Sequence, residues 1–177
     1  MQRRVREAMR YGLVLSLFVA LLATTASAHE IRPAIVTVSF PAGDRVEILI
    51  SANLEALMAG IGAEHKDSND APEATAYNTL RALPPGELAT RFRAFAPRYL
   101  SGLSASFDGA RATLAIASID VPDIRETSLA RISSLRLEGQ RPPAARTFQW
   151  SYPRTFGSSV LRTRSTGQAP QSAAVRS

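Results

Sequence analysis

Apolar and polar residues alternate along two runs in the first third of the chain, at 31–40 and 45–52. Every second residue from Val36 to Phe40 is apolar, and the same holds from Val46 to Ile50. A period of two places successive side chains on opposite faces of a strand. The residues between the runs, 41–44, are of the types that form turns. The pattern therefore predicts a β-hairpin.

The spacing of apolar residues then changes to that of helices. Asn53 is suited to cap a helix, apolar residues recur three or four positions apart after it, and Gly60 is suited to end it. A second short helix is predicted at 75–83. Together with a third helix, these segments predict a helical insertion over 53–100.

The third helix is expected to begin at Pro85, whose fixed φ suits the first turn. Its apolar residues form one stripe, which consists of Leu88, Phe92, Phe95 and Tyr99. Pro97 is expected to end or kink the helix one turn early, because proline cannot donate the backbone hydrogen bond.

The period of two returns after Leu103. Asp108-Gly109 is a strong hairpin-turn signal, and the return strand is expected to run on through alternating Ala112, Leu114 and Ile116. Further strands are predicted at 132–138 and 156–164 and around Trp150. The strand around Trp150 has the clearest buried face, formed by Phe148, Trp150 and Tyr152. The indole N–H of Trp150 is expected to donate to a buried acceptor. The predicted fold class is mainly β: an Ig-like antiparallel β-sandwich with a helical insertion after the second strand.

The first 28 residues have the three parts of a secretory signal peptide. Four arginines fall within the first ten positions, 13–23 is an apolar run, and Ala26-Ser27-Ala28 is a small-residue cleavage site. The run is shorter than the roughly 20 residues of a membrane-spanning helix, which favours cleavage over retention as an anchor. The organisation expected is a cleaved signal peptide at 1–28, a domain at 29–164 and a disordered polar tail at 165–177. The mature chain, with no predicted membrane span, is expected to be periplasmic or secreted.

Charge and cysteine content narrow the possible classes of function. The net charge of +6 resides at the two ends, since 1–28 and 162–177 each carry +3 and 29–161 is neutral. A nucleic-acid-binding domain would present a basic face, so nucleic acid is not an expected partner. The chain has no cysteine, which excludes disulfides, thiolate metal ligands and cysteine nucleophiles.

Cleavage after Ala28 would leave His29 as the first residue of the mature chain. Its α-amine and imidazole could together chelate a metal, with help from Glu30 or from His65 in an acidic loop. Nitrogen donors of this kind favour Cu(II), followed by Ni(II) and Zn(II). The alternative is that His29 is an accident of cleavage and His65 a solvated loop residue, because spacing does not bring the two histidines together.

No pattern in the chain is typical of an enzyme. The Gly-x-Ser-x-Gly elbow of hydrolases, the glycine-rich phosphate loop and the dinucleotide-binding fingerprint are all missing from the sequence. We therefore predict no catalytic residues and no organic cofactor.

Three short segments resemble the N-terminal extracytoplasmic region of HupE/UreJ-type membrane proteins. They are Ala28-His29-Glu30-Ile31-Arg32-Pro33-Ala34, Phe148-Gln149-Trp150-Ser151-Tyr152-Pro153 and the stretch from Phe156 to Arg162. The resemblance implies a β-rich region outside the cytoplasm. In that family membrane helices follow and carry the residues linked to nickel or cobalt uptake, whereas no apolar run follows Arg164 here, so transport itself is not implied.

Two functional hypotheses follow. The first is an exported, non-enzymatic periplasmic domain that assists transition-metal handling or transport, with a membrane transporter or another envelope protein as its partner. The alternative is a metal-free partner-binding or structural module of the cell envelope.

Overall fold

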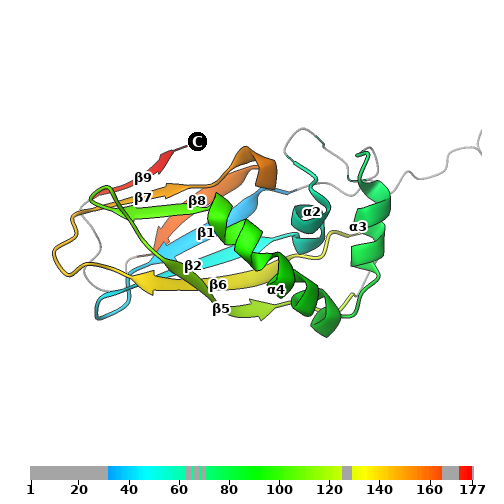
Figure 1. Ribbon diagram of the computed structural model, residues 1–177, viewed down its shortest axis with the longest axis horizontal. Coiled ribbons are helices and arrows are strands. Elements are labelled where there is room, and N and C mark those ends of the chain that lie inside the picture. Colours follow the sequence, from blue (N-terminus) through cyan, green and yellow to red (C-terminus); the bar gives the residue numbers. More distant parts are fainter. Residues whose placement is uncertain are drawn as a thin grey trace, which may run out of the picture.

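The structure, a computed structural model, describes residues 32–62, 65, 68, 71–124 and 129–164, together with the backbone of 172–176. This part of the chain is mainly β and forms a sandwich-like arrangement of two sheets (Figure 1). Two short helices lie at one end of the sheets, and a longer helix crosses beside them. The predicted signal peptide lies outside the described residues.

The first sheet has five strands in the order β5-β6-β2-β1-β8. Its members are β1 (Ala34–Ser39), β2 (Arg45–Ala52), β5 (Leu114–Asp120), β6 (Ser133–Gln140) and β8 (Ser159–Arg164). The second sheet has four strands in the order β4-β3-β7-β9. These are β3 (Ser104–Phe107), β4 (Ala110–Arg111), β7 (Thr147–Ser151) and β9 (Ser172–Arg176).

The helices described lie mainly between β2 and β3, where the sequence predicts a helical stretch. They are α2 (Leu54–Ala59), α3 (Ala74–Arg81) and α4 (Pro85–Gly102), and a short 3-10 turn, η1 (Arg154–Phe156), follows β7. The predicted caps of α2 are confirmed. The Ala56 N–H donates to Asn53 Oδ1 over 3.0 Å, and Gly60 adopts the left-handed conformation that ends the helix.

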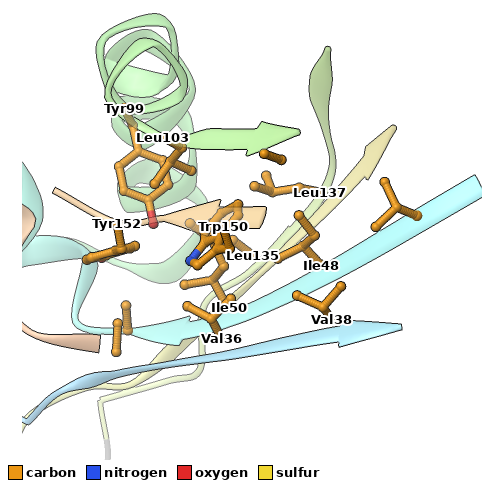
Figure 2. Close-up of a cluster of buried hydrophobic side chains, with 14 of the residues drawn as sticks. Val36, Val38, Ile48, Ile50, Tyr99, Leu103, Leu135, Leu137, Trp150 and Tyr152 are labelled. Atoms are coloured by element: carbon orange, nitrogen blue, oxygen red, sulfur yellow. The ribbon is translucent and has the colours of Figure 1, made fainter. Parts of the chain in front are cut away.

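The core consists of the alternating apolar faces of both sheets. Val36, Val38, Ile48 and Ile50 of the first sheet are fully buried, and Trp150 comes to them from the second sheet (Figure 2). Burying one such side chain contributes roughly 1.5–3 kcal/mol, so this face stabilises the stacking of the sheets. The prediction that Phe148, Trp150 and Tyr152 share a buried face is confirmed. The indole N–H of Trp150, however, has no hydrogen-bond partner among the described residues.

Helix α4 continues through Pro97, which contradicts the expectation that it ends or kinks one turn early. Proline leaves the carbonyl of Arg93 without its usual helical donor. Both Pro97 and Arg93 are exposed, so water can hydrate that carbonyl, and the stripe of Leu88, Phe92 and Tyr99 stays buried against the sheets.

The strand that follows the predicted turn crosses from one sheet to the other. Asp108 and Gly109 both have positive φ, as that turn requires, but β4 pairs with β3 only at its two residues. The chain then passes Thr113 and pairs with β6 as β5. At this crossing a Cβ on Gly139 would lie 2.8 Å from the Thr113 carbonyl oxygen. The expected continuous return strand is therefore wrong, and glycine at 139 makes the close crossing possible.

Two strand pairs differ from the predicted all-antiparallel arrangement. β1 pairs with β8 in parallel, and β7 pairs with β9 in parallel. Neither pair is joined by a tight turn, so no hairpin imposes an antiparallel direction on it. Within the segment 165–177, for which the sequence predicts a disordered tail, the backbone of Ser172–Arg176 forms β9 beside β7. The remaining residues of that tail lie outside the described part of the chain.

Candidate functional site

The structure brings no metal site together from the predicted ligands. His29 and Glu30 lie outside the described residues, whereas His65 is described and half-buried. Across the described residues, no three histidine, aspartate or glutamate side chains are placed to hold one ion. The proposed chelate therefore stays a hypothesis drawn from the sequence.

A group of buried polar side chains instead joins the helices to the segment before β6. Arg131 Nε donates to Glu55 Oε1 over 2.7 Å, and Arg131 Nη1 donates to the Leu83 carbonyl over 3.1 Å. Glu55 lies in the first turn of α2, where the sequence indicates only a favourable interaction with the helix dipole. The ion pair holds α2, the end of α3 and the start of β6 in fixed positions.

A second set of bonds anchors α3 to the same place. Asn53 Nδ2 donates to the Tyr77 hydroxyl over 3.0 Å, so the residue that caps α2 also holds α3. Arg81 donates to the same hydroxyl over 3.4 Å and to the carbonyl of Leu129. The pattern of the sequence does not reveal these contacts, because the partners come from separate segments.

A groove with a volume of 590 Å³ lies between α2, α4 and η1. Its apolar walls are formed chiefly by Leu57, Met58, Phe95 and Phe156. Arg98 and Arg154 supply two cationic side chains, and no acidic side chain of the described residues lines the groove. We call this feature the arginine groove.

The two arginines of the groove are available for a ligand. Both are exposed, and neither guanidinium forms an ion pair or hydrogen bond within the described residues. The guanidinium carbon of Arg98 lies 5.8 Å from the ring centre of Phe95, within the range of a cation–π contact. No sequence signal predicts the groove, because Arg98 and Arg154 lie far apart in the chain and resemble ordinary surface arginines.

An aromatic cluster supports the wall of the groove that η1 forms. The ring of Phe156 packs 5.0 Å from that of Tyr99 and 6.2 Å from that of Tyr152. A Cβ on Gly102 would lie 2.7 Å from Phe156, so α4 and η1 are in close contact. This packing holds the groove in shape before any ligand binds.

Beneath this wall the two tyrosine hydroxyls are buried together. Burial raises the pKa of Tyr99 well above its usual value, and the neighbouring Tyr152 adds to the shift. Burial likewise raises the pKa of Tyr152. Neither hydroxyl has a hydrogen-bond partner of normal geometry among the described residues. Figure 2 shows the side chains of Tyr99 and Tyr152 on the same side of Trp150. Both groups are therefore neutral at ordinary pH and contribute packing rather than chemistry.

None of the described helices is both long enough and apolar enough to cross a membrane. Comparison of the chain with protein-family models, with curated proteins and with solved structures found no match. The resemblance to HupE/UreJ-type proteins accordingly rests on the sequence segments alone.

Proposed function

We propose that the chain is an exported, non-enzymatic binding module of the cell envelope, and that its arginine groove contacts a partner such as a membrane transporter. The observation that carries this proposal is a pair of exposed cations beside apolar walls, Arg98 and Arg154, which form no ion pair with any residue that the structure describes. Arginine and aromatic residues dominate the energetics of protein–protein contacts, and both are present here.

The arrangement of β1 and β8 supports the relation to the HupE/UreJ ectodomain. The segments that carry the resemblance lie far apart in sequence, yet Ala34 pairs with Ser159 and Val36 with Leu161. Strands from the first and last of these segments that lie side by side in one sheet agree with one family region spanning both. We further propose that the two sheets form an Ig-like sandwich, which the stacking of their alternating apolar faces favours.

Photo-crosslinking in the native host tests the proposed contact. A photoreactive amino acid is introduced at Met58 or at Thr155, both in the groove, or at the exposed control position Thr90 on α4. We expect a discrete protein adduct from the two groove positions and none from Thr90. Adducts of equal yield from all three positions, or from none, would contradict the proposal.

Transition-metal handling is the second candidate function, because the structure brings the segments leading to both histidines towards one end of the domain. The Ala34 N–H, at the start of β1, donates to the Ser158 carbonyl over 2.9 Å, next to η1. Gly62, three residues before His65, lines the groove that η1 borders.

Processing and copper titration together test the metal hypothesis. Intact-mass measurement of protein from the periplasm should give a chain that begins at His29. That protein should bind one Cu(II), whereas His29→Ala and a variant with one extra residue before His29 should lose most of the affinity. His65→Ala should lower the affinity for Cu(II) only if His65 is a ligand. A mass that includes residues 1–28, or equal binding by the extended variant, would refute the N-terminal chelate.

A further inference from the structure

We infer that the arginine groove binds a carboxylate group attached to an apolar body, with the carboxylate between Arg98 and Arg154. The inference rests on the proposed binding function of the same groove and names the chemistry that the groove recognises. The carboxylate can belong to a free organic acid or to a protein partner, and the experiment below separates these two sources.

The charge of the groove determines the sign of the ligand. Arg98 and Arg154 line it, no acidic side chain of the described residues does so, and neither guanidinium is neutralised by a described neighbour. Two uncompensated cations on one concave surface attract an anion and repel a cation.

The planar guanidinium favours a carboxylate. Arginine presents its N–H groups in a fixed fork, which matches the two oxygens of a carboxylate. The guanidinium carbon of Arg98 lies over the ring of Phe95, 5.8 Å from the ring centre. This contact uses none of the guanidinium N–H donors, and within the described residues no other group accepts from them, so they can donate to a ligand.

The apolar walls determine what the carboxylate must be attached to. Met58, Leu57 and Phe156 line the same groove, whose volume of 590 Å³ lies within the range of small-molecule sites. A fully hydrated anion such as acetate would leave these walls in water. A carboxylate with an aromatic or aliphatic body would cover them, which adds hydrophobic free energy to the ion pairs.

Binding of 3-phenylpropanoate to the full mature chain, followed by amide chemical shifts and calorimetry, tests the inference. We expect saturable binding with shifts at Gly60, Gly62 and Thr155, all of which line the groove. Arg98→Gln and Arg154→Gln should each weaken binding about tenfold, the usual effect of losing one charge-assisted hydrogen bond. Arg93→Gln is the matched control, because Arg93 is also exposed on α4 but does not line the groove.

Two further ligands test whether binding needs the negative charge and whether the carboxylate comes from a protein or from a free acid. The neutral 3-phenylpropanamide should not bind, and a short peptide with a C-terminal Phe carboxylate should bind through the same amides. Tighter binding of the peptide indicates a protein carboxylate, and tighter binding of the small acid indicates a free one; either result supports the inference.

The inference is overturned if neither acid binds saturably, if the amide binds as well as the acid, or if Arg93→Gln weakens binding as much as the groove variants. Tighter binding of phenyl phosphate than of 3-phenylpropanoate would overturn the choice of carboxylate. Carboxylate binding without crosslinks in cells would refute the partner proposal alone, and crosslinks without carboxylate binding would refute this inference alone.

Discussion

Arg131 Nε lies 2.7 Å from Glu55 Oε1, and the two side chains are only 3% and 0% exposed. This buried ion pair connects the helix after β2 to the segment that leads into β6. Removing one partner should be costly, because the other charge would remain in an interior that cannot solvate it. The same reasoning predicts that removing both partners together costs less than removing one.

We expect Arg131→Met to lower the free energy of unfolding by about 3–5 kcal/mol, measured in urea. The double variant Glu55→Leu/Arg131→Met should lose less than the single one. Glu87→Gln is the control, since Glu87 and Arg91 form an exposed pair at 4.0 Å that should contribute under about 0.5 kcal/mol. An equally small loss from Arg131→Met would contradict the burial of the pair.

Replacing Gly139 or Gly86 by alanine should change the stability of the fold in opposite directions. A Cβ at Gly139 would meet the Thr113 carbonyl oxygen at 2.8 Å, so Gly139→Ala should destabilise the fold by about 1–3 kcal/mol. Nothing lies within 4 Å of a Cβ at Gly86, in the first turn of α4, so Gly86→Ala should stabilise it by up to about 1 kcal/mol. Thermal melts of both variants check this contrast, and a neutral Gly139→Ala would show that the crossing strand can move aside.

Trp150 and Tyr99 are both fully buried, but their truncation should differ in cost. Trp150→Ala removes a large side chain from between the sheets and should cost about 3–5 kcal/mol. Tyr99→Phe removes only a hydroxyl that has no hydrogen-bond partner of normal geometry among the described residues, so its effect should stay within about 1 kcal/mol. Urea melts measure both. A larger loss from Tyr99→Phe would mean that the hydroxyl is hydrogen-bonded in solution.

The raised pKa of Tyr99 predicts a loss of stability at alkaline pH. Above its usual value of 10.0 the unfolded chain releases the phenol proton, while the buried phenol retains it. The folded state then binds more protons than the unfolded one, so the free energy of unfolding falls as pH rises through this window. Below pH 10.0 the contribution of the neutral phenol is fully present. Urea melts of the parent and Tyr99→Phe at increasing pH should show a shallower decline in the variant, and identical slopes would contradict the prediction.

Local patterns were sufficient for most elements but not for their pairing. The hairpin of β1 and β2, the cap at Asn53 and the turn at Asp108-Gly109 each depend on neighbouring residues, so the sequence predicts them directly. The passage of β5 to the other sheet depends on an opening at Gly139, a residue distant in sequence. The expectation that Pro97 ends or kinks α4 was wrong for a similar reason. Whether a helix can continue through a proline depends on the exposure of the helix side on which the proline lies.

The candidate sites show the same difference between features set by local sequence and features set by distant contacts. His29, Glu30 and His65 are candidate ligands because of their nitrogen and oxygen donors, and the first two lie outside the described residues. The arginine groove was not predicted, because a lone surface arginine has no distinguishing local pattern. Its identity as a site depends on Arg98 and Arg154 lining one concave surface beside Phe156.

Periodicity and caps act over a few residues, so the local sequence specifies where most strands and helices form and which of their faces are apolar. Three relationships follow from the folded arrangement instead: Glu55 pairs with Arg131, β1 lies beside β8, and two arginines share one groove. Each of these relationships joins residues that are distant along the chain. They arise when the apolar faces are buried together, and no local pattern records which distant side chains that burial will bring into contact.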